Sequence, residues 1–374
     1  MSKARELADV IGTQDTTENV LQGRRNLIIN GAMQVAQRGT QTTGVTGSNY
    51  FTCDRMKVVP ASLGTWTVDQ STDAPNDFSN SFKVTCTTAD ASPAAGDYMN
   101  IRHIVEAQNL QHLAFGTSDA KSMTLSFWVK SNKTGTATVN IRKPDTTHRQ
   151  VSPTYTISSA DTWEYKTITI VGDTDSTGVI DNDNGQGFSV EWWLNSGSDF
   201  TTGTNQTAWT NLNNADRNVS NLGVGGAVND YFAITGVQLE VGSVATPFEH
   251  RSYGEELALC QRYFQRIEGP SGAYMPLIPS INGGTANARV LVPLAQSMRN
   301  DPSIGYSSAG ALAIRNRGSF TMYTSTSITL PTEKVVDNPA MVSLSVGVSS
   351  GLTAAEINIP YLSLGAYLDF DSEL

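Results

Sequence analysis

The stretch that decides the fold is ITGVQLEVGSVATPFEHRSYGEELALCQRYF, residues 234–264. It predicts a β-strand, a turn and then a capped helix with seven-residue periodicity. It places no catalytic residue type where it could react. A second distinctive stretch, NLIINGAMQVAQRGT, occupies residues 26–40. Because the two lie about one domain length apart, we expect them to bracket a globular unit.

The strand of the first stretch changes phase partway along. Phe232 and Ile234 share one parity, whereas Val237, Leu239 and Val241 have the opposite one. A β-bulge shifts side chains in this way by inserting one residue, and glycine often marks it. We therefore predict a bulge at the intervening glycine, residue 236.

The helix that follows begins with a capping box, Ser252-x-x-Glu255. Behind it, apolar residues recur at spacings of 4, 3, 4 and 3: Tyr253, Leu257, Cys260, Phe264 and Ile267. That spacing is typical of an a/d seam about two heptads long. Two interpretations stay open: an amphipathic connector that lies on a neighbouring sheet, or a short threefold helical bundle at a subunit axis.

Length and composition indicate a mainly β protein of more than one domain. A chain of 374 residues suits two domains and a tail. Only 16% of the residues are charged and 39% are hydrophobic, which argues against a long coiled-coil rod. Abundant Thr, Ser, Asn and Gly favour antiparallel sheets with one solvated face.

Charge and cysteine content limit the partners. The 25 basic residues are scattered among 35 acidic ones, for a net charge of −10, so nucleic-acid binding is disfavoured. Cys53, Cys86 and Cys260 form no CxxC motif, and we expect reduced, mostly buried thiols. The N-terminus lacks an apolar signal region, and no stretch is apolar enough to insert into a membrane.

The chain divides into four predicted segments. Residues 1–25 contain a short helix whose apolar face includes Leu7, Ala8 and Ile11, and this face must dock on trimer mates or on another protein. Residues 26–250 alternate strands with Gly-, Asn-, Asp- and Pro-rich turns, which predicts an antiparallel β-sandwich or jelly roll. Residues 251–270 form the connecting helix. Residues 271–374 return to strands and predict a second, smaller β-sandwich.

Three tryptophans are the candidate ligand-binding residues. Strand parity places Trp128 and Trp193 on the outer faces of their sheets, where an aromatic ring could stack on a sugar. Trp209 lies in a Gly-, Thr- and Asn-rich loop and is a further candidate. The alternative is that loops or a neighbouring subunit cover these rings.

Catalytic and metal-binding patterns are weak. The acidic residues lie mostly in turns, where they form local hydrogen bonds, and neither a GxSxG elbow nor an HExxH motif occurs. Residues 173–184 match part of a calcium loop, but Asn184 stands where a bidentate glutamate is required, so we favour a hairpin loop. We expect no cofactor, no metal and no enzymatic activity.

Three motifs together resemble tail-fibre proteins of tailed bacteriophages, especially those of marine and cyanobacterial phages: residues 26–31 (NLIING), 234–251 (ITGVQLEVGSVATPFEHR) and 260–264 (CQRYF). In that family the first motif opens a jelly roll like a carbohydrate-binding module, the second closes it, and the third lies on the helix that follows. Residues 126–130 (SFWVK) match as well, and the resemblance covers residues 26–266.

The resemblance implies a homotrimeric virion component, made in the host cytoplasm, that contacts host lipopolysaccharide or another surface glycan without cleaving it. Its N-terminus would dock on a tail adaptor, a nozzle or another virion protein. One departure is that Ala32-Met33 follows Asn30-Gly31, where such jelly rolls often carry an acidic residue that helps to hold calcium. A head- or collar-attached fibre or decoration protein and a polysaccharide depolymerase are the alternative functions.

Overall fold

The structure is a computed structural model that describes residues 25–145, 147–316, 320–331 and 340–374. The predicted N-terminal helix with Leu7, Ala8 and Ile11 lies outside these residues. The chain forms two compact units. Unit 1 contains residues 25–32, Thr43–Asn49 and Lys57–His250, and unit 2 contains Met33–Thr42, Tyr50–Met56 and Arg251–Leu374.

The two units are not consecutive stretches of the chain, as the four predicted segments are. Two short pieces near the start, Met33–Thr42 and Tyr50–Met56, belong to unit 2 rather than to the jelly roll. The reason is long-range bonding that the local sequence does not reveal: Gln37 donates to the carbonyl of Phe264, and Arg38 pairs with Asp371.

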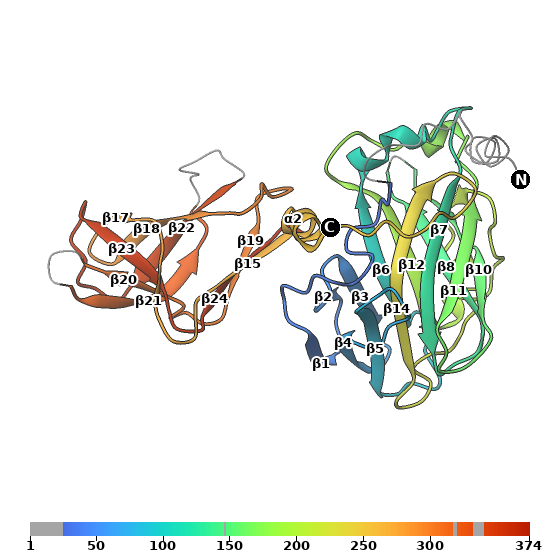
Figure 1. Ribbon diagram of the computed structural model, residues 1–374, viewed down its shortest axis with the longest axis horizontal. Helices are drawn as coiled ribbons and strands as arrows, with labels where there is room; N and C mark the ends of the chain where they lie inside the picture. The colour runs from blue at the N-terminus through green and yellow to red at the C-terminus, as the bar shows by residue number, and fades with distance from the viewer. Residues whose placement is uncertain (1–24, 146, 317–319, 332–339) are drawn as a thin grey trace, which may run out of the picture. The chain divides into compact units, whose positions relative to one another are not determined.

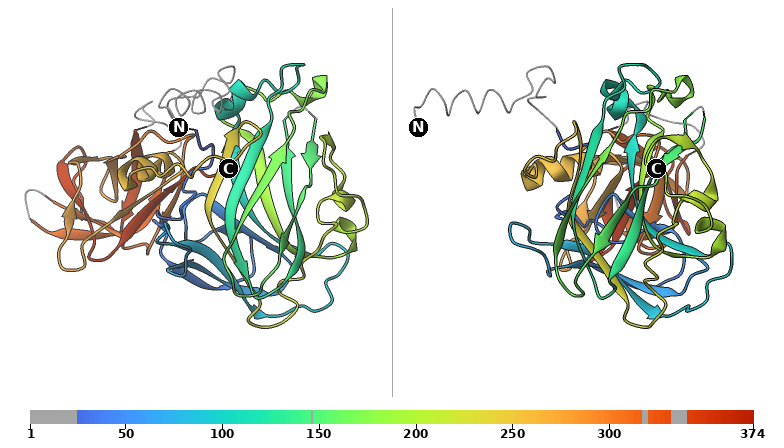
Figure 2. Two further views of the ribbon diagram at one scale, coloured as in Figure 1. Left: turned by 45° about the vertical axis from the view of Figure 1, so that its right-hand side comes forward. Right: turned by 90° about the vertical axis from the view of Figure 1, so that its right-hand side faces the viewer.

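Unit 1 is built from antiparallel strands, as predicted (Figures 1 and 2). The first sheet has the order β1-β4-β5-β14-β7-β11. Its strands are β1 (Gln41–Val45), β4 (Thr65–Ser71), β5 (Ser81–Thr88), β14 (Tyr231–Val241), β7 (Met123–Ser131) and β11 (Glu164–Ile170).

The second sheet of unit 1 has the order β13-β9-β8-β12-β6-β3-β2, with β10 paired to β8. Its strands are β13 (Thr210–Asn211), β9 (Arg149–Val151), β8 (Gly135–Lys143), β12 (Gln186–Ser196), β6 (Tyr98–Glu106), β3 (Met56–Ala61), β2 (Asn49–Tyr50) and β10 (Thr154–Ile157). Short 3-10 turns lie at η1 (Ala107–Leu113), η2 (Ser176–Gly178), η3 (Ser198–Phe200) and η4 (Asn214–Asp216).

Alternating apolar residues bring the two sheets of unit 1 face to face. On β7, Leu125, Phe127 and Val129 are fully buried. The ring of Phe127 meets Trp192 of β12 edge-on, with centroids 5.8 Å apart. Such edge-to-face aromatic pairs are favourable beyond their buried area, and this one joins the core of the sandwich across its two layers.

The predicted bulge in β14 is confirmed. Thr235 pairs with Trp128 and Gln238 with Ser126, so two residues of β14 oppose one of β7. Gly236 takes a φ of 59°, which glycine adopts without strain. The shift keeps Ile234 and Leu239 on the core side, where both are fully buried.

The opening motif of the jelly roll pairs with β14 beyond this bulge. β5 pairs with β14 only over Tyr231–Ile234. Further along, Leu27 N donates to the Leu239 carbonyl and Val237 N donates to the Gly31 carbonyl, both at 2.9 Å. A Cβ at Gly31 would overlap the Val237 carbonyl, so this close approach requires glycine.

Unit 2 contains two further antiparallel sheets. The smaller has the order β15-β24-β19, and the larger β16-β23-β17-β18-β22-β21-β20. The strands are β15 (Phe264–Glu268), β24 (Tyr367–Asp371), β19 (Ser303–Tyr306), β16 (Met275–Pro276), β23 (Ile357–Leu362), β17 (Ser280–Asn282), β18 (Asn287–Pro293), β22 (Met341–Val348), β21 (Met322–Thr329) and β20 (Leu312–Arg315).

In the larger sheet β20 also pairs with β23, which closes six strands into a ring. Alternate residues of β18 and β22 fill its interior, among them Val290, Leu344 and Val346. Closure leaves these strands with few free edges, and Phe370 of β24 joins the same core.

The single α-helix of the described chain, α2 (Tyr253–Gln261), begins with the predicted capping box of Ser252 and Glu255. The predicted continuous seam over residues 253–267 is wrong, because the helix ends at Gln261. Phe264 and Ile267 belong instead to β15, which pairs with β24. Tyr253 is 57% exposed, Leu257 is half-buried and Cys260 is buried. Of the five predicted seam residues, only Tyr253, Leu257 and Cys260 therefore lie on the helix.

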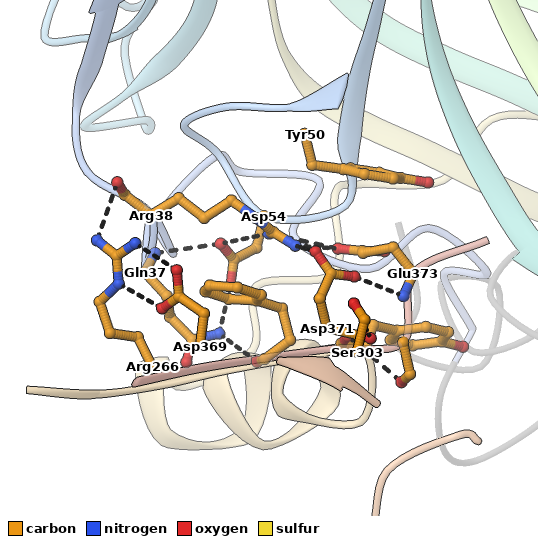
Figure 3. A network of polar contacts seen from close by, with 12 residues as sticks. Gln37, Arg38, Tyr50, Asp54, Arg266, Ser303, Asp369, Asp371 and Glu373 are labelled. Atoms are coloured by element: carbon orange, nitrogen blue, oxygen red, sulfur yellow. Dashed lines mark hydrogen bonds and ion pairs between the residues drawn. The ribbon is translucent and has the colours of Figure 1, made fainter. Parts of the chain in front are cut away.

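A polar network fixes the start of β15 in unit 2 (Figure 3). Arg266 binds Asp369 through two bonds of 2.7 and 2.8 Å. Arg38 pairs with Asp371 at 3.0 Å and lies over the Phe264 ring at 3.5 Å. The second half of the 26–40 stretch thus contacts the end of the 234–264 stretch. These polar contacts, rather than a helical seam, hold Phe264 in position.

The cysteines are buried, as expected. Cys53, Cys86 and Cys260 are all buried and form no disulfide. Burial raises the pKa of each thiol, which makes it a poor nucleophile. Among the residues described, no helix has the length and apolar content needed to cross a bilayer.

Candidate functional site

Two of the three candidate tryptophans are not open to solvent. Trp193 is fully buried, with Tyr98 and Phe200 rings 5.3 and 5.2 Å away and the Arg217 guanidinium 4.7 Å above it. The parity prediction for Trp193 is correct, and of the two interpretations the one with a loop cover holds, because segments that follow β12 place Phe200 and Arg217 over the ring.

Trp209 is also buried, with 8% exposure. Its ring stacks on Phe188 with centroids 5.8 Å apart, and its Nε1 donates to the Val171 carbonyl at 2.8 Å. These contacts hold the loop against the body of unit 1. The expectation that Trp209 presents an open ring in a loop is therefore wrong.

Trp128 is the candidate that stays partly exposed. It lies on the outer side of β7, and its directly opposite partner on β11 is Tyr165. The two rings lie 5.4 Å apart at an angle of 47°, and Tyr165 is 43% exposed. Tyr165 was missed as a site residue, although the parity of β11, with Ile168 and Ile170 buried, already placed it outward.

The bulge in β14 makes room for Trp128. A Cβ on Gly236 would lie 3.0 Å from Trp128 Cδ1 and 2.6 Å from Phe78 Cζ. Phe78 in turn meets Phe248 and His250, with ring centroids 5.0 and 5.4 Å away. We call these rings, which run across Gly236, the aromatic strip: Tyr165, Trp128, Phe78, Phe248 and His250.

Polar side chains lie next to the aromatic strip, on the same outer side of the sheet. Asp73 accepts from Lys130 Nζ at 2.8 Å and from Trp163 Nε1 at 3.0 Å. Partial burial opposes ionisation of this carboxyl, but these two hydrogen bonds bring the pKa of Asp73 below its ordinary value. Tyr231 donates its hydroxyl to Asp161 at 2.6 Å.

This arrangement suits recognition of a ligand that has both an apolar and a hydroxylated face. Ring faces offer apolar contact area, while fixed donors and acceptors at their edge can bind hydroxyl groups. Trp128 and Tyr165 come from neighbouring strands, so the sheet holds their spacing rigidly and a ligand would order few side chains on binding.

The partial calcium pattern at residues 173–184 has a different local explanation. Both carboxylate oxygens of Asp173 accept from Arg149, at 2.6 and 3.0 Å, and Asp175 caps the η2 turn through Thr177 N. In the part of the chain that the structure describes, no group of three or more His, Cys, Asp or Glu side chains is placed to hold a metal.

Comparison with known proteins gives structural matches only. No protein-family model and no curated protein matches the chain. Solved structures similar to it include the enzymatically active domain of tailspike protein 4 of bacteriophage CBA120, at 14% identity and a TM-score of 0.31. That match covers 58% of this chain and 21% of the tailspike chain, so this chain spans only a small part of its length.

Two further matches each cover almost the whole length of the matched protein. A putative sugar-binding protein from Bacteroides thetaiotaomicron matches 58% of this chain and 100% of its own, at 13% identity and a TM-score of 0.30. A structure described as "CBM4 structure and function" matches 57% of this chain and 99% of its own, at 12% identity and a TM-score of 0.27. At such values, and with folds that host many functions, these likenesses decide nothing about activity.

Proposed function

We propose that unit 1 is a non-catalytic carbohydrate-binding domain and that its aromatic strip holds the ligand. The observation that carries the proposal is the Trp128–Tyr165 pair, two adjacent rings kept partly open on the outer side of a rigid sheet. The polar group around Asp73 supplies donors and acceptors beside them. A sugar ring presents C–H groups to such a surface and hydroxyls to its edge.

The wider role is that of a tail-fibre protein of a tailed phage, which contacts host lipopolysaccharide or another surface polysaccharide. The motifs at 26–31, 234–251 and 260–264 support it through their resemblance to that family. A homotrimer would present three copies of the aromatic strip together. Weak sites that are linked in this way gain avidity through a high effective concentration.

Substitution at Tyr165 tests the binding site. Tyr165→Ala is compared with Tyr274→Ala, because the two tyrosines are exposed to 43% and 44% and lie in different units. On an array of bacterial polysaccharides, the bound glycan should lose about 3- to 10-fold in affinity with Tyr165→Ala, as expected for an aromatic contact. Equal binding by both variants and the wild type would reject the aromatic strip as the site.

Two measurements test the remaining parts of the proposal. Sedimentation equilibrium at micromolar concentration should give the mass of a trimer, and a monomer would contradict the fibre assembly. Incubation with the glycan identified on the array should release no new reducing ends. Their appearance would replace binding with depolymerase activity.

A further inference from the structure

A second group of side chains lies on the outer face of the other sheet of unit 1, at the buried carboxylate of Glu191. Arg102 of β6 is its directly opposite partner, and Arg142 of β8 lies diagonally on the other side. Their Nε atoms are 3.6 and 3.7 Å from Oε1 of Glu191. Arg217 donates to Oε2 at 2.7 Å. We call these four residues the arginine cluster.

The arginine cluster carries more positive than negative charge. Burial opposes the ionisation of Glu191, but the three guanidinium groups bring its pKa down to about 2. One carboxylate therefore faces three permanent cations. Burial and repulsion from Arg217 and Arg102 together outweigh Glu191 and lower the pKa of Arg142, which identifies Arg142 as the least compensated member.

Several polar atoms at this face have no hydrogen-bond partner among the described residues. They include Nε of Arg142, Nε of Arg217, Nδ2 of Asn100 and Oδ1 of Asn140. Asn100 and Asn140 lie opposite Trp193 and Glu191 in the strand register, on the same face. Each unsatisfied buried polar atom costs about 1–3 kcal/mol, and a ligand bound at this face would pair the atoms gathered here.

A structural ion pair in the same unit shows the contrast. Arg149 meets both oxygens of Asp173 and also lies 3.3 Å from Asp175, so its charge is fully compensated. Arg142, by comparison, donates no hydrogen bond from its guanidinium to the described protein. Arg102 and Arg142 keep 14% and 21% of their side chains exposed, so a ligand can approach them from solvent.

We infer that the arginine cluster is a second binding site, for the anionic group of an acidic sugar. A guanidinium fork matches the two oxygens of a carboxylate and equally a sulfate or phosphate group. Asn100 Nδ2 and Asn140 Oδ1, the atoms of these amides that have no partner among the described residues, would then bind neighbouring hydroxyls. That the anion is carried on a sugar rests on the proposed function, whereas anion binding itself does not.

Arg142→Gln is the test variant, because it removes one charge without breaking a hydrogen bond of the protein. Lys121→Gln removes one charge from an exposed position of the same unit and is the control. Calorimetric titrations use an oligogalacturonide, a neutral galacto-oligosaccharide and inorganic sulfate. Arg142→Gln should weaken binding of the oligogalacturonide about 10- to 100-fold, as expected for loss of a charge-assisted contact, and Lys121→Gln should not.

The probes separate the sources of the anion. Binding of the oligogalacturonide alone assigns a sugar carboxylate. Binding of sulfate as well, with the same sensitivity to Arg142→Gln, assigns the broader class of sulfate and phosphate esters. If no anionic probe binds, or if Arg142→Gln binds them as the wild type does, the inference is overturned.

Two controls complete the design. Arg142→Gln should unfold at or above the wild-type temperature because Glu191 compensates this cation only in part. A lower temperature would assign Arg142 a structural role and overturn the inference. Tyr165→Ala separates the two sites. If Tyr165→Ala abolishes binding of all sugars and Arg142→Gln leaves binding intact, the aromatic strip is the binding site and the arginine cluster is rejected. If only Arg142→Gln abolishes binding, the arginine cluster is the binding site and the aromatic strip is rejected.

Discussion

The side chain of Asn26 donates from Nδ2 to the main-chain carbonyl of Val237 at 3.0 Å, inside the bulge of β14. Its Oδ1 accepts from Leu239 N at 3.1 Å and from Ile28 N at 3.0 Å. One buried side chain thus pairs two main-chain groups on the edge of β14 that β5 leaves uncovered beyond Ile234, together with the N–H of Ile28. This explains in physical terms why an opening Asn and a closing strand with a phase shift belong together in the sequence.

Asn26→Ala should therefore destabilise unit 1. It leaves three buried main-chain groups without their partner, and at about 1 kcal/mol for each lost bond the free energy of unfolding should fall by about 3 kcal/mol. Urea denaturation followed by tryptophan fluorescence measures the change. Asn76→Ala, at an exposed asparagine of the same unit, is the control and should change stability very little. A similar loss for both variants would contradict the role assigned to Asn26.

Gly236→Ala should disturb both the bulge and the aromatic strip. Gly236 and Gly223 have φ values of 59° and 72°, so alanine meets comparable backbone strain at both, about 1–3 kcal/mol. Only at Gly236 would the new Cβ also meet Phe78 and Trp128, since nothing lies within 4 Å at Gly223. Gly236→Ala should weaken glycan binding, whereas Gly223→Ala should lower stability alone. Equal glycan binding by the two variants would show that the bulge does not support the binding site.

The elements that could be predicted from the sequence depend on neighbouring residues. The bulge at Gly236 shows as a change of parity within one strand, and the capping box of Ser252 and Glu255 lies within four residues. The helical seam failed for the opposite reason. Phe264 fits the heptad spacing of a helix, but it is the first residue of β15. Its strand partner, Asp371, lies about a hundred positions away in the sequence. No local pattern distinguishes these two outcomes.

The candidate site shows the same limit. Parity placed Trp128 and Trp193 on outer faces, and the strand register agrees for both. Their exposure depends on what else reaches each face. Phe200 and Arg217 cover Trp193, whereas Trp128 keeps an open neighbour in Tyr165. Loop positions of this kind follow from long-range packing, which a single sequence does not display.

Glu191 should make unit 1 sensitive to strong acid. Its pKa falls from an ordinary 4.5 to about 2 in the folded protein, so its contribution to stability is present above pH 4.5 and is lost as the pH falls through 2. A shift of this size corresponds to about 3 kcal/mol. Denaturation midpoints of the wild type should fall between pH 5 and 2 more steeply than those of Glu191→Gln. Parallel pH profiles would contradict the charge compensation argued for the arginine cluster.

Asp54 should act in the opposite direction in unit 2. Burial raises its pKa from 3.8 to about 6, although Arg38 and a hydrogen bond from Gln37 oppose the shift. Because the folded pKa is the higher one, this stabilising contribution is complete below pH 3.8 and is lost as the pH rises through 6, by about 3 kcal/mol at most. The wild type should therefore lose stability between pH 4 and 7 relative to Asp54→Asn, which cannot titrate and keeps a similar shape. Unfolding of unit 2 followed by hydrogen exchange of β15 and β24 amides at both pH values measures the difference. A stability difference between Asp54→Asn and the wild type that does not change with pH would show that the network around Arg38 holds Asp54 ionised.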